Sequence, residues 1–151
     1  MSNILVTGAT GFVGRTLCPA LQQAGHAVSG TTRSFTGDVD GVAMRAIGDM
    51  GAGVDWRPLL DGVDTVVHLA ARVHVMKEED GDLLTRYRRV NSKATQHLID
   101  TAADAGVRRF VYLSTIKVHG ETAGGTPLSE DDNAAPDDPY GQSKWEAEQA
   151  I

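Results

Sequence analysis

The chain has 151 residues, of which 41% are hydrophobic, enough apolar material for one globular domain with its own core. Its formal net charge of -6 disfavours a general nucleic-acid surface, because phosphate binding depends on clustered Lys and Arg. No apolar run approaches the ~20 residues that cross a bilayer, and the single cysteine, Cys18, cannot form a disulfide within the chain. These features favour a cytoplasmic protein that binds neither nucleic acid nor membrane.

Short β-branched runs alternate with segments of helical periodicity, as in a parallel sheet whose strands are joined by crossover helices. Strands are predicted at residues 3–7, 27–32, 43–47, 65–69 and 110–114, and helices at 12–24, 54–60 and 82–105, with a last helix from Tyr140. Pro19 predicts a kink or an early 3-10 start in the first helix, and Pro58 interrupts the second. The alternation predicts an α/β fold.

Two further segments carry expectations about organisation. Residues 120–139 are rich in Gly, Pro, Asp and Asn and form a predicted long loop, a kind of segment that is usually functional in compact domains. The chain stops at Ile151 inside the last helical pattern without a cap, so we expect an incomplete polypeptide. The basic cluster of Arg86, Arg88 and Arg89 lies near acidic residues and is interpreted as a solvated helix face.

A glycine-rich turn follows the first predicted strand and opens the first helix. Gly8, Gly11 and Gly14 stand at every third position. In this context the first glycine permits the tight turn, the second lets backbone approach a pyrophosphate, and the third lets the helix pack closely on the sheet. The helix amino terminus then offers unpaired N–H groups to an anion, so residues 8–14, with Thr10, Phe12 and Val13 among them, are candidate phosphate contacts. A turn that serves only chain reversal is the alternative.

The Gly-x-x-Gly-x-x-Gly spacing resembles that of the extended branch of the short-chain dehydrogenase/reductase superfamily. Two later segments strengthen the likeness: His68-Leu69-Ala70-Ala71-Arg72 at the end of the fourth strand, and Tyr140-Gly141-Gln142-Ser143-Lys144 at the start of the last helix. Together they resemble the NAD-dependent epimerase/dehydratase family over nearly the whole chain. The resemblance implies a Rossmann doubly wound parallel sheet with strand order 3-2-1-4-5, a single NAD(P)-binding domain at 1–151, and a missing carboxy-terminal substrate domain.

The end of the second strand bears on the choice of cofactor. NAD sites commonly place a carboxylate there, whereas this chain has Thr31, Thr32, Arg33 and Ser34. Arg33 suits a 2'-phosphate, so NADP is slightly favoured over NAD, and an exposed Arg33 without a ligand is the alternative. The resemblance further implies adenine contacts from Asp49 and Met50 and cofactor contacts from Leu69, Ala70 and Ala71. His68 is interpreted as a structural strand residue.

Tyr140 and Lys144 are four residues apart, which places them one turn apart on the same helix face. A nearby ammonium favours phenolate; lowering a tyrosine pKa from about 10 to about 7 requires about 4 kcal/mol, which a buried lysine and a cationic nicotinamide could supply together. The resemblance implies that Tyr140 is the general acid or base, that Lys144 also contacts the cofactor, and that Thr115 binds the reacting oxygen.

Other positions near these residues keep alternatives open. Ser114 is a weaker candidate than Thr115, and His119 replaces the tyrosine that the family usually has in Val118-His119-Gly120. Asn91 either orients the lysine region or is a buried structural amide. No residue pattern indicates a metal site.

The family resemblance implies hydride transfer at a carbon of a nucleotide sugar, as in a 4-epimerase or a 4-keto reductase, and a homodimer at full length. Two alternatives remain: a catalytically silent NADP-binding protein that senses redox state or supports an assembly, and a reductase of a non-sugar ketone. Because the substrate domain is expected to be missing, we expect the 151-residue chain to have little activity alone and its fifth strand to have an unpaired edge.

Overall fold

The computed structural model describes residues 1–34, 39, 41–73, 82–120 and 127–151. The described chain divides into two compact units. The first comprises Met1–Ala71 and His97–Leu113, and the second comprises Arg72–Gln96 and Ser114–Ile151.

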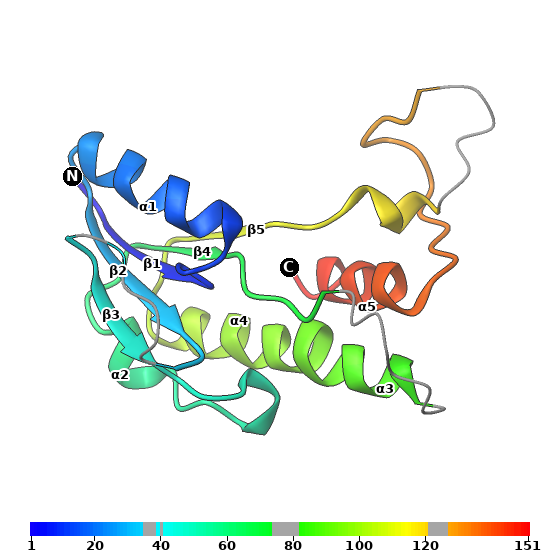
Figure 1. Cartoon of the computed structure of the whole chain (residues 1–151), viewed down its shortest axis with the longest axis horizontal. Helices are drawn as coiled ribbons and strands as arrows, with labels where there is room; N and C mark the ends of the chain where they lie inside the picture. Colours follow the sequence, from blue (N-terminus) through cyan, green and yellow to red (C-terminus); the bar gives the residue numbers. More distant parts are fainter. Residues whose placement is uncertain (35–38, 40, 74–81, 121–126) are drawn as a thin grey trace. The chain divides into compact units, whose positions relative to one another are not determined.

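The first unit contains a five-stranded sheet in which every neighbouring pair is parallel (Figure 1). The strand order is β3-β2-β1-β4-β5, which confirms the predicted order 3-2-1-4-5. The strands are β1 (Asn3–Thr7), β2 (Ala27–Thr32), β3 (Ala43–Ala46), β4 (Thr65–His68) and β5 (Arg109–Tyr112). Three strands end one or two residues earlier than predicted, because the ladder stops where the chain turns away at the carboxyl edge of the sheet.

The core of this unit follows the two-residue period of its strands. Ile4 and Val6 of β1 belong to one buried cluster together with Cys18 of α1 (Phe12–Gln23). Leu5, between them in sequence, points to the other face and is 1% exposed. Cys18 is therefore a packed core residue, as the sequence indicates, and burial raises the pKa of its thiol.

Prolines and glycines set the helix boundaries of the first unit. α1 remains α-helical on both sides of Pro19 and ends next to Gly25, whose φ is 86°. The short helix α2 is Arg57–Leu60, so the prediction that it starts at residue 54 is wrong. Pro58 lies in its first turn, where a missing N–H costs nothing, and therefore starts the helix instead of interrupting it. A 3-10 turn, η1, occupies Met50–Ala52.

The predicted long helix at 82–105 is present in three consecutive parts. They are α3 (Leu83–Tyr87), a π-helical turn η2 (Arg88–Lys93), and α4 (Ala94–Asp104), which begins in the second unit and ends in the first. The second unit also contains the 3-10 turn η3 (Ile116–His119) and the last helix α5 (Pro139–Glu148). The sequence predicted neither the π turn nor the 3-10 turns η1 and η3.

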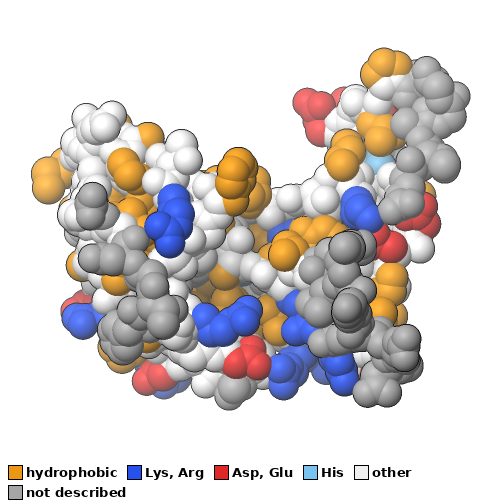
Figure 2. All heavy atoms as spheres, in the orientation of Figure 1, with side chains coloured by type: hydrophobic (Ala, Val, Ile, Leu, Met, Phe, Trp, Pro, Cys, Tyr) orange, Lys and Arg blue, Asp and Glu red, His pale blue; other side chains and the backbone are white. Residues whose placement is uncertain are grey.

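Two further features are the length of the helices and the distribution of charged side chains on the surface. In the part of the chain that the structure describes, no helix is long and apolar enough to cross a membrane. On the face that Figure 2 shows, the Lys and Arg side chains lie in several groups separated by apolar and uncharged atoms.

Candidate active site

The glycine-rich turn between β1 and α1 is built so that only glycine fits at two positions. Gly8 has a φ of 66°, and a Cβ there would lie 2.9 Å from the backbone nitrogen of Ala70. A Cβ on Gly14 would lie 2.5 Å from the carbonyl oxygen of Ala9 and 2.6 Å from that of Gly8. The close approach of Gly14 is thus to the turn itself, whereas the sequence predicted an approach to the sheet.

The amino terminus of α1 has the features of an anion site. Gly11 is the N-cap residue, with extended backbone and no side-chain cap, and the first turn contains no acidic residue. The amides that follow, those of Phe12, Val13 and Gly14, precede the first intrahelical donor, Arg15, which bonds to the Gly11 carbonyl at 3.0 Å. A pyrophosphate suits this turn, because the unpaired amides and the helix dipole favour negative charge there.

Hydroxyl groups connect the glycine turn with the neighbouring strand ends. Thr10 Oγ1 lies 3.2 Å from Thr32 Oγ1, at the end of β2. Thr7 Oγ1 accepts a hydrogen bond from the Ala70 N–H at 3.2 Å and lies 2.6 Å from Nδ1 of His68. His68 is fully buried, which agrees with its interpretation as a structural residue. The Thr7 hydroxyl therefore bonds to both His68 and the Ala70 N–H, and so holds the segment that begins at Ala70.

The remaining cofactor candidates of the first unit differ in exposure. Arg33 follows β2 and is exposed. Asp49 is also exposed, and its carboxylate accepts from the Gly51 N–H at 2.9 Å, which caps η1. Met50 is 8% exposed and Leu69 is half-buried against the core cluster. Thr32, which the sequence analysis placed at the end of the second strand but did not select as a contact, is bound to the glycine turn through Thr10.

In the second unit, α5 carries Tyr140 in its first turn and Lys144 one turn later. The Thr115 side chain acts on the Tyr140 phenol. Burial raises the pKa of Tyr140, and the Thr115 hydroxyl lowers it by less. Lys144 is 2% exposed, and burial lowers its pKa to about 8. The assignment of Thr115 to the reacting oxygen of a substrate stays a prediction, whereas the phenol pKa lies above its usual value and not below it as the sequence suggested.

The cation that lowers the pKa of the Tyr140 phenol here is Lys117, which sequence reasoning missed. Lys117 Nζ lies 2.5 Å from Oδ2 of Asp138, the N-cap residue of α5. The signal for Asp138 was available, because aspartate before Pro139 in the first helical turn is a common helix start. Nothing in the sequence indicated that Lys117 pairs with it.

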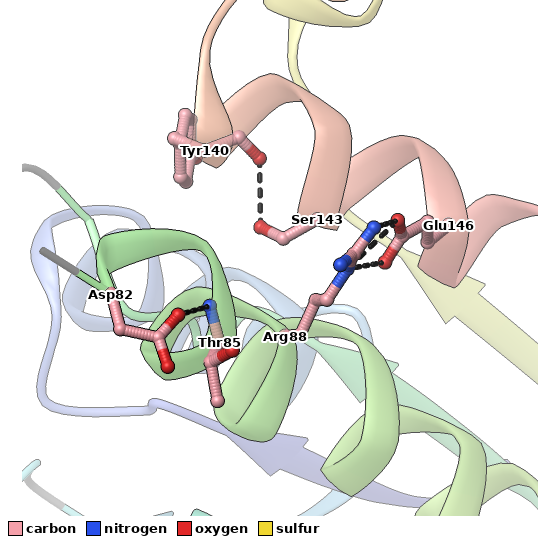
Figure 3. A network of polar contacts seen from close by, with 6 residues as sticks. All are labelled: Asp82, Thr85, Arg88, Tyr140, Ser143 and Glu146. Carbon is pink, nitrogen blue, oxygen red and sulfur yellow. Dashed lines mark hydrogen bonds and ion pairs between the residues drawn. The ribbon is translucent and has the colours of Figure 1, made fainter.

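A buried amide joins η2 to α5. Asn91 is 1% exposed; its Oδ1 accepts from the Arg72 N–H at 2.7 Å, and its Nδ2 donates to the Arg72 carbonyl and to Ser143 Oγ, each at 3.0 Å. Ser143 in turn donates to the Tyr140 carbonyl oxygen at 2.8 Å (Figure 3). These three hydrogen bonds of Asn91 serve this packing, as expected of a structural amide. A role in orienting Lys144 stays a prediction.

An ion pair gives a second connection between the same two elements. Arg88 of η2 binds both carboxylate oxygens of Glu146 on α5, at 2.9 Å from Nε to Oε2 and 2.6 Å from Nη2 to Oε1 (Figure 3). The predicted basic cluster is therefore divided: Arg88 is paired with Glu146, while Arg86 and Arg89 are exposed. This bidentate geometry is the stronger form of an ion pair.

The NAD dependent epimerase/dehydratase family matches residues 4–151. The chain belongs to this family. A curated member, UDP-glucose 4-epimerase of Vibrio cholerae, is 42% identical over 151 residues, which is 99% of this chain and 46% of the relative. A second relative, 3-beta-hydroxysteroid dehydrogenase of Mycolicibacterium neoaurum, is 31% identical and covers 100% of this chain and 43% of its own length.

A solved structure of the epimerase/dehydratase family gives the same fold. UDP-glucuronic acid 4-epimerase from Bacillus cereus, in complex with NAD, aligns with a TM-score of 0.81 at 30% identity, over 98% of this chain and 50% of its own. The chain thus spans about half the length of the family members that it matches.

Proposed function

We propose that the chain is the cofactor-binding and catalytic half of a nicotinamide-dependent oxidoreductase or epimerase that acts on a nucleotide sugar. The observation that carries the proposal is that Thr115, at the N-cap of η3, acts on the Tyr140 phenol, while Lys144 is buried one turn further along α5. A hydroxyl, a phenol and a desolvated ammonium form a set that can bind a substrate oxygen and move its proton.

In this proposal Tyr140 is the general acid or base and Thr115 holds the reacting oxygen of the substrate. Lys144 supplies positive charge and is itself a proposed cofactor contact. When bound, the nicotinamide supplies the hydride chemistry, taking a hydride from a sugar carbon or giving one. In an epimerase or dehydratase the hydride returns to the substrate, and in a reductase the cofactor leaves oxidised.

The cofactor would lie along the carboxyl edge of the sheet in the first unit. The glycine turn, the hydroxyls and the strand-end backbone would hold its parts. The proposed contacts are Gly8, Thr10, Gly11, Phe12, Val13, Gly14, Arg33, Asp49, Met50, Leu69, Ala70 and Ala71. We assign the whole of 1–151 to one NAD(P)-binding domain of the Rossmann type.

We propose NADP as the slightly preferred cofactor. Thr32 stands at the end of β2 with its hydroxyl 3.2 Å from that of Thr10, and the next residue is the exposed Arg33. A hydroxyl does not repel a 2'-phosphate as a carboxylate would, and a guanidinium can bind the phosphate with two hydrogen bonds. The Bacillus cereus neighbour contains NAD, so the preference needs a direct comparison of the two cofactors.

The similarity to a UDP-glucose 4-epimerase at 42% identity supports a nucleotide sugar as substrate. The similarity to a steroid dehydrogenase favours the second candidate, a reductase of a non-sugar ketone. A catalytically silent NADP-binding role is the third, and the retained Thr115, Tyr140 and Lys144 oppose it. We further propose a cytoplasmic homodimer at full length, with turnover that requires the other half present in the relatives.

The experiment is turnover by the full-length polypeptide with UDP-glucose, UDP-galactose and a steroid 3-ketone, each with NAD or NADPH. Interconversion of the two sugars without net cofactor oxidation supports an epimerase, and NADPH oxidation with one substrate supports a reductase. Tyr140→Phe should abolish either activity, whereas Tyr112→Phe, a matched change in β5, should not. Equal activity of the Tyr140 variant and the wild type would refute the proposal.

A further inference from the structure

Two short segments of the second unit carry the proposed acid–base pair. Thr115 is the N-cap residue of η3, and Tyr140 lies in the first turn of α5. Thr115 Oγ1 accepts from the Lys117 backbone N–H at 3.4 Å. Because a hydroxyl has one hydrogen to donate, this arrangement leaves that hydrogen for the phenol oxygen of Tyr140. The alignment of the pair therefore depends on how η3 meets α5.

The side chain of Asp138 acts on both segments. Its Oδ1 accepts from the Gly141 N–H at 2.5 Å, which caps α5, and its Oδ2 lies 2.5 Å from Lys117 Nζ. Burial pushes the pKa of Asp138 up, but the bonds from Lys117 and Gly141 outweigh it and leave the pKa below its usual value. The side chains of Lys117 and Asp138 are 30% and 21% exposed, so water screens this pair only in part.

The backbones of the same segments touch directly. A Cβ on Gly141 would lie 2.6 Å from the Lys117 carbonyl oxygen, so a side chain there would force η3 away from α5. The Ala135 N–H, on the approach to α5, donates to the Val118 carbonyl at 2.8 Å. Lys117 therefore contacts the start of α5 through its carbonyl and its ammonium, and its own N–H holds Thr115.

We propose that the Lys117–Asp138 ion pair is a positioning clamp that holds the Thr115 hydroxyl against the Tyr140 phenol. The clamp deepens the proposed function and rests on it, because it matters for catalysis only if Thr115 and Tyr140 act there. Lys117 and Asp138 are positioning residues, since each acts through Thr115 or Tyr140. An ordinary surface pair between these residues would contribute little, whereas this pair joins the two segments that carry the reacting groups.

The test is a titration of Tyr140 followed by NMR in protein labelled at tyrosine Cζ, which needs no substrate. Thr115→Val is made in the wild type, in Lys117→Met and in Asp138→Asn. Asparagine still caps a helix, so Asp138→Asn removes the ion pair and keeps the cap. The groups that act on the phenol are Asp138, Tyr87 and Lys117, and the direct charge effects of the two clamp variants have opposite signs.

In the wild type, Thr115→Val should raise the Tyr140 pKa, because a bond to the phenolate is lost. In Lys117→Met and in Asp138→Asn, the same change should produce less than half of that rise, and Lys117→Arg should restore it. An equal rise in every background, or none in the wild type, would overturn the clamp. Far-UV circular dichroism checks folding, and if Lys117→Met does not fold, Asp138→Asn and Lys117→Arg decide the question.

Failure of the clamp and failure of the proposed function are distinguishable. The titration reports the Thr115–Tyr140 contact whether or not UDP-glucose is turned over. In the full-length polypeptide with an accepted substrate, loss of the clamp should lower kcat while KM changes little. A rise in KM at unchanged kcat would instead assign Lys117 to substrate binding and overturn the positioning role.

Discussion

Replacing Lys144 by Met should stabilise the chain at neutral pH. Lys144 is 2% exposed, and burial lowers its pKa from 10.5 to about 8. Below pH 8 the folded chain must hold a buried ammonium, and above pH 10.5 the lysine is neutral in both states. The difference of about 2.5 pH units corresponds to about 3 kcal/mol at 1.36 kcal/mol per unit. Between these limits the unfolded state binds more protons, so the stability of the wild type rises with pH.

The measurement is the free energy of unfolding in urea for the wild type and Lys144→Met at several values between pH 7 and 10.5. The advantage of the variant should fall by about 3 kcal/mol over that range, most of it above pH 8. Lys93→Met is the matched control, because Lys93 is exposed and its replacement should give a difference that varies little with pH. An advantage of Lys144→Met that stays constant with pH would refute the desolvation argument.

Four further outcomes are expected. Gly14→Ala should cost at least about 2 kcal/mol of unfolding free energy, because its Cβ meets backbone oxygen at 2.5 Å. The same change should weaken NADPH binding in calorimetry. The control Gly25→Ala has open space around the new Cβ, so it should cost about 1 kcal/mol and leave NADPH binding intact. Arg33→Ala should weaken NADPH binding more than NADH binding, and the reverse would overturn the NADP assignment. Asn91→Ala should cost about 3 kcal/mol in urea unfolding, since the half-buried Arg72 backbone and the buried Ser143 hydroxyl lose their bonds to the amide. No loss would show that water replaces the amide. The 151-residue chain should turn over UDP-glucose far more slowly than the full-length polypeptide, and equal rates would contradict the need for the other half.

The individual strands and the glycine turn could be predicted because their signals are local, whereas the strand order came from the family resemblance. A β-branched run followed by glycines predicts a strand and the turn after it, and this prediction does not depend on the rest of the chain. The same holds for Gly25 at the end of α1. Pro58 shows the limit of such rules, since proline stops a helix in its interior and starts one in its first turn. Only the neighbouring packing decides between the two.

The π turn and the clamp could not be predicted because both depend on partners far away in the sequence. No proline or glycine marks residues 88–93. The contacts made there, Asn91 to Ser143 and Arg88 to Glu146, span 52 and 58 residues. Lys117 and Asp138 are 21 residues apart, and although Asp138 before Pro139 marks a helix start, nothing in the sequence indicates that Lys117 pairs with it. Such pairs become visible only when the fold brings the segments together.

The pKa values of Tyr140 and Lys144 also change the mechanism that the sequence suggested. From its spacing, Lys144 was expected to lower the pKa of Tyr140, yet burial raises the phenol pKa and lowers that of the ammonium. Both changes favour neutral groups, so the folded chain alone holds Tyr140 protonated at neutral pH. In that state the phenol is ready to give a proton to a carbonyl oxygen. To take a proton from a hydroxyl it needs additional positive charge nearby, which an oxidised nicotinamide ring supplies when bound. The proposed site thus would match the proton state of Tyr140 to the redox state of the cofactor, acid for reduction and base for oxidation.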